Sequence, residues 1–436
     1  MTKKIMLSLA LASAMFAEEE IKKEEPKKEA KSIEEAFKLA DIKGQIRAVY
    51  QSNSKLNGEK TADTLLGGKL SIETASLYGI SVGGTFYTAN KMSSKQNAKD
   101  ADYYNNDKGY TILGESFVKY SFKDGEIKLG RMELDTPLVN SDDIRMIPNL
   151  YTAAMLTYSP LEKLNLTAGT VTQMAGWENG GDHSRFVKMG EVIESATTDS
   201  GGVWDTFFAN NNGARESKLY LVGATYEHDI FGAQAWYGRQ SEIMDTYYLE
   251  GNVKPFETDV LAVNIVAQYM KEKAIGKLKS YSGEAGNEAT KIDGNIYGIA
   301  LELESKSIGL KGSLAYNKSS KKEGYHANGG TAYFFGGGKD PLLTSMDVET
   351  ANGEGDVKAY KGEIGFDFAK VGVDGLGTSI AHAYFDKQAS DSYSKETDIT
   401  LSYAFKKASV EAMLTNIKAK DTDDNNRLRV FVKYDF

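Results

Sequence analysis

From about residue 41 to its last residue, the sequence alternates between apolar and polar side chains with a period of two. Tyr297, Ile299, Leu301 and Leu303, for example, are separated by glycine, alanine and glutamate. This is the period of a β-strand, whose successive side chains point to opposite faces. A soluble sandwich would bury the apolar face in a core, whereas a transmembrane barrel turns it toward lipid and lines a wet lumen with the polar face.

The lengths of the connections distinguish these two folds. Long connections (89–110, 134–150, 173–217, 271–293 and 319–356) alternate with short ones such as 123–125 and 406–408. Short periplasmic turns and long external loops are typical of bacterial outer-membrane barrels. We therefore predict an all-β fold, a single 18-stranded antiparallel transmembrane β-barrel over residues 43–436. Its strands are expected near residues 44–51, 65–74, 78–88, 111–122, 126–133, 151–158, 164–172, 218–227, 233–240, 245–252, 260–270, 294–305, 309–318, 357–368, 376–386, 396–405, 409–417 and 427–436.

Composition excludes several other classes of protein. The net charge of −9 argues against nucleic-acid binding, which requires a basic surface. The absence of cysteine excludes disulfides and thiolate metal sites, and the four histidines are widely spaced. A mean hydropathy of −0.42 is compatible with a membrane barrel, because half of each strand faces water.

The N-terminus predicts export. Two lysines precede a short apolar run that ends near Ala17, which is the pattern of a signal peptide over residues 1–17, cleaved after Ala14 or Ala17. Residues 18–42 are expected to form a charged periplasmic spacer with one short helix, begun by a capping box of Ser32 and Glu35. The run is too short to span a bilayer as a helix. The predicted location is the outer membrane of a Gram-negative bacterium.

Three short motifs suggest other chemistry, and each fails on its context. The G-x-S-x-G match around Ser81 lies inside a predicted strand rather than at a strand-to-helix turn. The glycine-rich segment 336–340 lacks the Ser or Thr and the following helix of a phosphate loop. The acidic segment 421–426 lacks the glycine and the final carboxylate of a calcium loop, although loose divalent-cation binding stays open. We predict no enzyme activity, no cofactor and no defined metal site.

The connection 134–150 combines charges with apolar residues that an exposed loop tip seldom carries. A loop folded back into the barrel could bury those apolar residues against the wall. A barrel of this size leaves an aqueous channel unless something narrows it. We therefore expect this loop to form the constriction, through Asp135, Asp142, Asp143 and Arg145. An ordinary surface loop is the alternative.

Several basic residues fall on the polar faces of the predicted strands. Those of the first and last strands would become neighbours when the barrel closes, and they would form a basic column opposite the loop carboxylates. Lys69 and Lys433 share this parity but could equally be solvated lysines near the rims. The predicted basic wall consists of Arg47, Lys119, Lys311, Lys361, Arg427 and Arg429.

The last ten residues, RLRVFVKYDF, alternate strictly except at Phe431 and end on an aromatic side chain. In a closed barrel this strand must pair with the first one, so that no edge is exposed to lipid. This terminal strand resembles the signal that bacterial outer-membrane assembly machinery recognises.

Residues 129–149, 336–346 and 427–436 together resemble the OprD family of outer-membrane porins. The resemblance extends from about residue 32 to the C-terminus. It implies an eighteen-stranded barrel, a basic wall column facing an acidic patch, and passive uptake of small polar solutes such as amino acids, peptides or carboxylates.

We therefore predict an outer-membrane channel for passive diffusion of small polar solutes and ions. Outer-membrane lipids, lipopolysaccharide and the assembly machinery are its expected partners, and a homotrimer is one assembly open to it. Two alternatives remain: an adhesin or structural barrel with functional external loops, and a barrel enzyme. The enzyme would need a catalytic cluster, which His183 and His326 could be mutated to test.

Overall fold

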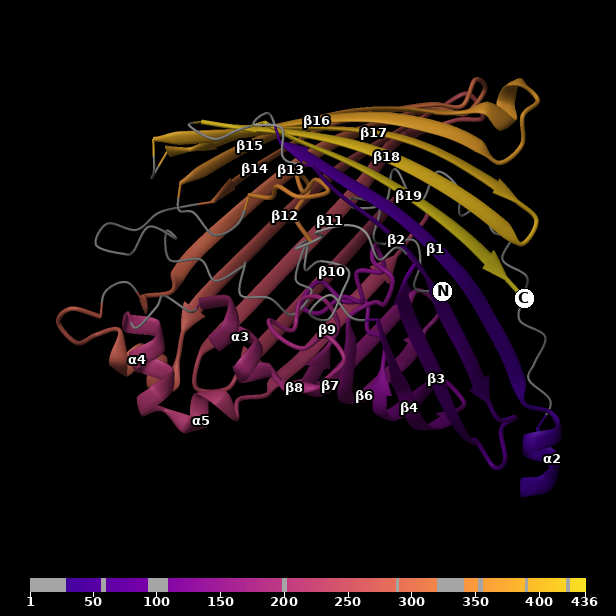
Figure 1. The fold of residues 1–436 in the computed structure, drawn as a ribbon, viewed down its shortest axis with the longest axis horizontal. Coiled ribbons are helices and arrows are strands. Elements are labelled where there is room, and N and C mark those ends of the chain that lie inside the picture. The colour runs from indigo at the N-terminus through magenta and orange to yellow at the C-terminus, as the bar shows by residue number, and fades with distance from the viewer. Residues whose placement is uncertain are drawn as a thin grey trace.

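The computed structural model describes residues 29–55, 60–92, 109–197, 202–287, 290–319, 341–351, 356–388, 391–420 and 424–436. Their strands form one antiparallel sheet that closes on itself (Figure 1). The predicted signal peptide, residues 18–28 of the charged spacer and the segment 336–340 lie outside these residues.

The first and last strands close the barrel as predicted. β1 (Asp41–Lys55) pairs antiparallel with β19 (Asn425–Asp435), so that Arg47 lies opposite Lys433 and Val49 opposite Phe431. The backbone of Phe436 and Gly44 also exchanges two hydrogen bonds. No edge is therefore left at this seam.

The sheet contains nineteen strands, of which the two-residue β8 (Val187–Lys188) pairs only with the end of β7. Because β7 also pairs with β9, the remaining eighteen strands form the closed barrel, which confirms the predicted fold. The other strands are β2 (Lys60–Glu73), β3 (Ile80–Lys91), β4 (Tyr110–Phe122), β5 (Gly125–Met132), β6 (Leu150–Leu161), β7 (Leu164–Ala175), β9 (Leu219–Glu227), β10 (Phe231–Gln240), β11 (Met244–Glu257), β12 (Leu261–Ala274), β13 (Asp293–Ser305), β14 (Leu310–Ser319), β15 (Val357–Asp367), β16 (Leu376–Lys387), β17 (Ser392–Phe405) and β18 (Ala408–Ala419).

The two faces of the barrel wall differ as the alternation predicts. On β1, the outward Ile46 and Tyr50 are 50% and 40% exposed, whereas the inward Arg47 and Gln51 are 2% and 4% exposed. The same contrast runs along the other strands, whose exposed large side chains are mostly Leu, Ile, Val, Tyr and Phe. Apolar side chains thus point away from the barrel axis, which suits a wall surrounded by lipid. In the described part of the chain, no helix is long and apolar enough to cross a membrane.

Most of the strands are longer than predicted, and two of the long connections contain helices that the sequence reasoning missed. α3 (Met189–Thr197), α4 (Val203–Asn210) and α5 (Asn212–Arg215) lie between β8 and β9, and α6 (Gly276–Tyr281) lies between β12 and β13. They share a small apolar core that includes Trp204, Phe207, Phe208 and Leu278. In Figure 1, α3 to α5 lie at the end of the barrel opposite to α2 and the C-terminus.

The short N-terminal helix α2 (Ile33–Lys38) begins where it was predicted. Ser32 accepts a hydrogen bond from the Glu35 amide at 3.1 Å, which is one half of a capping box. The Glu35 carboxylate, however, accepts from the Lys31 amide at 2.7 Å rather than from Ser32.

The G-x-S-x-G match is part of the barrel wall. Ser81 lies inside β3 and donates a hydrogen bond to Glu73 of β2 at 3.0 Å. Ser81 is therefore a polar side chain of the barrel wall that links β3 to β2.

Candidate functional site

The connection between β5 and β6, residues 133–149, packs against inward-facing side chains. Leu138, Val139, Met146 and Ile147 are each at most 3% exposed, so its apolar residues are buried as expected for a loop inside the barrel. Its first part forms a tight turn around Thr136, whose hydroxyl accepts hydrogen bonds from the amides of Leu138 and Val139. The Thr-Pro sequence favours such a turn, because proline fixes one backbone angle and the hydroxyl bonds the next amides.

The two halves of this segment contact different sides of the wall. Met146 and Ile147 belong to an apolar cluster with Val49 of β1 and Phe431 of β19. Leu138 approaches β10 so closely that a Cβ added at Gly238 would lie 2.8 Å from its Cδ1 atom. The segment therefore contacts β1 and β19 with one half and β10 with the other. Phe431 breaks the alternation of the last strand because it forms part of the surface on which this segment packs.

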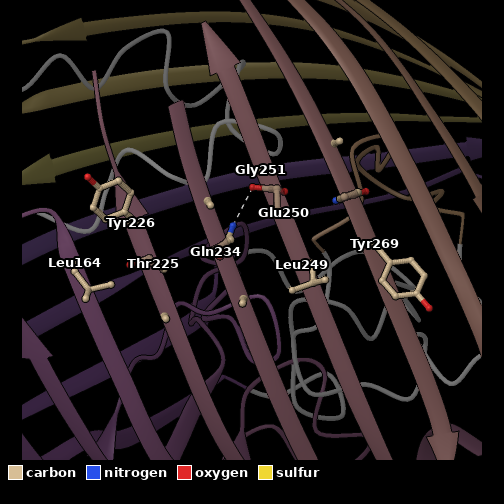
Figure 2. A pocket seen from close by; sticks show the side chains of 13 residues that line it. Leu164, Thr225, Tyr226, Gln234, Leu249, Glu250, Gly251 and Tyr269 are labelled. Atoms are coloured by element: carbon tan, nitrogen blue, oxygen red, sulfur yellow. Dashed lines mark hydrogen bonds between the residues drawn. The ribbon is translucent and has the colours of Figure 1, made fainter. Parts of the chain in front are cut away.

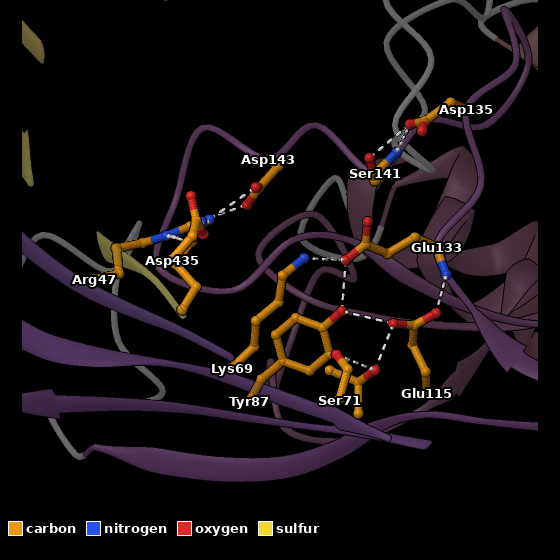
Figure 3. A network of polar contacts seen from close by, with 12 residues as sticks. Arg47, Lys69, Ser71, Tyr87, Glu115, Glu133, Asp135, Ser141, Asp143 and Asp435 are labelled. Atoms are coloured by element: carbon orange, nitrogen blue, oxygen red, sulfur yellow. Dashed lines mark hydrogen bonds and ion pairs between the residues drawn. The ribbon is translucent and has the colours of Figure 1, made fainter. Parts of the chain in front are cut away.

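Arg47 and Asp143 join this segment to the first strand (Figure 3). The Asp143 carboxylate accepts hydrogen bonds from Nη1 and Nη2 of Arg47 at 2.7 and 2.8 Å. Nε and Nη2 of Arg47 also donate to Gln45, and Nη1 donates to the Arg145 carbonyl oxygen. Burial opposes ionisation of Asp143, but Arg47, with Lys433 and Lys69, lowers the pKa of this carboxyl below its ordinary value of 3.8. Nε, Nη1 and Nη2 of Arg47 thus all donate hydrogen bonds, and those of Nη1 and Nη2 hold the loop against β1.

The other three loop residues singled out in the sequence have different surroundings. Asp135 accepts a hydrogen bond from the Ser141 hydroxyl at 2.6 Å and so braces the loop internally (Figure 3). Asp142 has a positive φ of 43° and its amide donates to the Asn140 side chain. The Arg145 guanidinium lies 4.5 Å from the ring of Trp177. Asp143 is the carboxylate of this loop that binds Arg47.

A second polar network lies at the base of the same loop (Figure 3). The Tyr87 hydroxyl of β3 donates to Glu133 at 2.5 Å and contacts Glu115 at 3.1 Å. Lys69 lies 3.3 Å from the Glu133 carboxylate. Lys69 is therefore paired with the start of the loop.

A second segment, residues 341–351 between β14 and β15, also packs against the inner wall. Gln268 of β12 donates to the Pro341 carbonyl at 2.8 Å and accepts from the Leu343 amide at 3.0 Å. Asn317 of β14 accepts from the amide and hydroxyl of Thr344, each at 2.9 Å. These two inward amides fix the beginning of the segment.

Asp347, farther along this segment, binds the two arginines of the last strand. Its carboxylate lies 3.3 Å from Nη1 of Arg427 and also forms an ion pair with Arg429. Burial opposes ionisation, but Arg429, Arg145 and Arg427 lower the pKa of Asp347 below its ordinary value of 3.8.

The sequence reasoning missed Asp347. A usable signal was present, because residues 341–351 combine apolar residues and carboxylates in a long connection, as residues 134–150 do.

Two carboxylates of β17 hold the same segment by its backbone. Glu396 accepts hydrogen bonds from the amides of Val348 and Glu349 at 3.0 and 2.7 Å, and Asp398 accepts from the Asp347 amide at 3.3 Å. Two acidic side chains on β17 thus face two arginines on β19 across Asp347. Such an arrangement can orient a polar solute that carries both signs of charge.

The remaining basic residues predicted for the wall are spread around the barrel. Lys119 of β4 pairs with Glu73, and Lys311 of β14 pairs with Glu304 at 3.4 Å. Lys361 of β15 donates to the Ser345 carbonyl at 3.1 Å and lies 3.6 Å from Glu363. These three lysines therefore lie apart from the arginines of β1 and β19, whereas Lys433 lies opposite Arg47.

The described residues contain no group of three or more His, Cys, Asp or Glu side chains that could hold a metal ion. Of the acidic segment 421–426, residues 421–423 lie outside the described part, and Asp424 pairs with Lys418 at 2.9 Å.

A hollow of about 530 Å³ lies in the wall between β7 and β12 (Figure 2). It is bounded by small residues such as Ala233, Ala235 and Gly251 and by Leu249 and Tyr269. It contains no residue of either inward segment, and we place the candidate site at the segments instead.

Comparison with known proteins gave consistent matches. Residues 69–436 match the model of the OprD family, described as outer membrane porins. No curated protein matches the chain.

Solved structures share the fold. Pseudomonas aeruginosa OccK9 (OpdG) superimposes with a TM-score of 0.74 at 14% identity, over 92% of this chain and 99% of that one. Acinetobacter baumannii OccAB1 gives 0.72 at 19% identity, over 95% and 99%. The structure of Pseudomonas aeruginosa OpdK with vanillate gives 0.70 at 15% identity, over 91% and 98%.

Proposed function

Because the chain belongs to the OprD family of outer membrane porins, we propose which of its groups control passage through the barrel. The protein is a channel for small solutes in the bacterial outer membrane, and its family consists of channels rather than enzymes. The open questions are where the bore is narrowest and which solutes it favours.

The constriction consists of the two inward segments, 133–149 and 341–351. The observation that carries this proposal is that the first segment contacts Gly238 of β10 at one point and the cluster around Phe431 of β19 at another. A segment fixed on two sides of the wall must obstruct the bore between them. Arg47 acts as a positioning residue, since Asp143, Gln45 and the Arg145 carbonyl occupy its donors.

The solutes favoured are small and polar and carry a carboxylate. Arg427 and Arg429 both form ion pairs with the carboxylate of Asp347, so two guanidinium groups lie side by side at this point of the wall. A guanidinium group binds a carboxylate through two parallel hydrogen bonds. Glu396 and Asp398 lie on the other side of Asp347 and accept the backbone amides of Asp347, Val348 and Glu349. Amino acids and small organic acids fit this pattern, and the related OpdK has been solved with vanillate, which is itself a carboxylate.

The orientation in the membrane follows from the lengths of the connections. Short connections such as 123–124 and 406–407 lie at the end of the barrel where β1 begins and β19 ends. This end faces the periplasm. The long connections, including the two inward segments and α3 to α6, belong to the external end. Residues 1–17 serve as the signal peptide and residues 18–42 as a charged periplasmic spacer with α2.

The decisive experiment is single-channel recording in planar bilayers, with the reversal potential measured in a salt gradient. Wild-type protein is expected to conduct, and Arg427→Ala/Arg429→Ala is expected to lose anion preference. Lys406→Ala/Lys407→Ala removes the same charge from a turn at the periplasmic end and serves as the control. Absence of conductance in the wild type would favour a structural or adhesive barrel, and an unchanged anion preference would remove the two arginines from the selectivity site.

A further inference from the structure

A row of tyrosine pairs lies on the outer face of the barrel at the end with the long connections. The members of each pair come from neighbouring strands, and their ring centroids are 5.1 to 6.0 Å apart. Aromatic belts of this kind lie at the membrane–water interface. They mark the level at which lipid headgroups begin. The pairs are Tyr237–Tyr247, Tyr269–Tyr297, Tyr316–Tyr360 and Tyr384–Tyr393.

On β10 to β13, the basic residues just beyond this row are neutralised by aspartates. Arg239 lies 2.8 Å from Asp245 on the adjacent strand. Lys271 lies 2.8 Å from Asp293 in the same way. Each of these two basic side chains therefore has an aspartate partner on the neighbouring strand.

On β14 to β18, lysines lie directly opposite each other in two registers, and Asp386 of β16 lies opposite Lys358. Lys318 lies directly opposite Lys358 in the β14–β15 register, two residues beyond Tyr316 and Tyr360. Lys395 lies directly opposite Lys418 in the β17–β18 register, and its Nζ is 5.4 Å from the ring centroid of Tyr393. Like charges directly opposite each other in a sheet are destabilising unless something balances them. Asp424 balances Lys418, whereas no ion pair of Lys318 or Lys358 occurs within the described residues.

The apolar wall below Lys318 and Lys358 is open. Leu314 and Ile364 are 66% and 59% exposed, and Gly362 and Gly312 lie directly opposite them on the neighbouring strands. Without side chains, the two glycines leave shallow recesses beside the large apolar residues. A lipid chain can lie along this surface while its headgroup reaches the lysines.

We propose that Lys318, Lys358, Lys395 and Lys418 bind the phosphate groups of a lipid headgroup in the outer leaflet, that of lipid A in lipopolysaccharide. Lysine binds phosphate as a point charge, and two lysines facing each other match the charge of one phosphate group. A lipid is favoured over free phosphate because the apolar wall and the tyrosine row lie directly below. This inference rests on the proposed orientation, in which the row faces the outer leaflet.

The test measures lipid binding by native mass spectrometry of the full barrel, purified free of lipid in detergent. The probes are lipid A, lipid A without its phosphates, and phosphatidylglycerol. Each surface lysine contributes about a fivefold gain in affinity for an anionic headgroup, so Lys318→Gln/Lys358→Gln is expected to bind lipid A about thirtyfold more weakly. The control Lys406→Gln/Lys407→Gln, at the opposite end, is expected to bind like wild type.

Wild-type binding of lipid A should also weaken as sodium chloride rises from about 0.05 M to about 0.5 M, a result that needs no variant to fold. The proposal is overturned if the double variant keeps wild-type affinity, or if dephosphorylated lipid A or phosphatidylglycerol binds as tightly as lipid A. Conductance separates this proposal from the channel function. A double variant that conducts normally and binds lipid A normally refutes the lipid site alone, whereas a wild type that does not conduct refutes the proposed channel.

Discussion

Replacing Asp347 by asparagine removes a carboxylate that pairs with both Arg427 and Arg429, and it changes the side-chain shape very little. The Asp347 and Arg429 side chains are 2% and 3% exposed, so bulk water does little to screen this pair. A charge about 6 Å from a passing anion, at an effective dielectric constant of about 40, contributes about 1.4 kcal/mol. We therefore expect Asp347→Asn to raise the ratio of anion to cation permeability about tenfold.

The assay is the reversal potential of single channels in a tenfold salt gradient, where such a change shifts the potential by tens of millivolts. Asp229→Asn is the matched control, since Asp229 is a carboxylate 85% exposed in the turn between β9 and β10 at the other end of the barrel. Its reversal potential should stay close to that of wild type.

Adding Arg429→Gln to Asp347→Asn restores the local charge, and the reversal potential should return toward the wild-type value. The reasoning is refuted if Asp347→Asn leaves the permeability ratio unchanged, because Asp347 would then be screened from the path of the ions. It is refuted equally if the ratio moves toward cations.

Three further outcomes are expected. Ile147→Ala removes a side chain that is 2% exposed, so the inward segment should lose about 2–5 kcal/mol of packing free energy and become a protease-sensitive segment with noisier conductance; unchanged proteolysis would contradict its packing on the wall. The lowered pKa values of Asp143 and Asp347 mean that their ion pairs persist at neutral pH and are lost only as pH falls below about 3.8, so current noise should increase there and not between pH 5 and 8. Ser32→Ala removes the cap of α2 and should cost about 1 kcal/mol locally, seen as faster amide exchange of that helix with the barrel unaffected.

The period-two pattern predicted the barrel well because the physics behind it is local. In a wall one strand thick, each side chain faces either lipid or the lumen, and the parity of its position decides which. Ile46 and Arg47 could therefore be assigned to opposite faces from their positions alone. The pairing of β1 with β19 followed from the need to leave no edge, which is a condition on the whole sheet that needs no detailed contacts.

The helices of the long connections could not be predicted in the same way. α3, α4 and α6 are short, and they are stabilised mainly by a shared core of side chains such as Trp204, Phe207 and Leu278 from distant parts of the sequence. A short isolated helix is marginal in water, so its existence depends on tertiary packing.

The features of the candidate site can likewise be separated into those that the sequence predicted and those that only the structure showed. By itself the sequence determined the barrel, the inward face of Arg47, Arg427 and Arg429, and the unusual apolar content of residues 134–150. Only the tertiary structure decided that Asp143 binds Arg47 and that the arginines of the last strand bind Asp347. The reason is that strand parity fixes a direction, whereas the partner of a charged side chain depends on how two long connections pack against the wall.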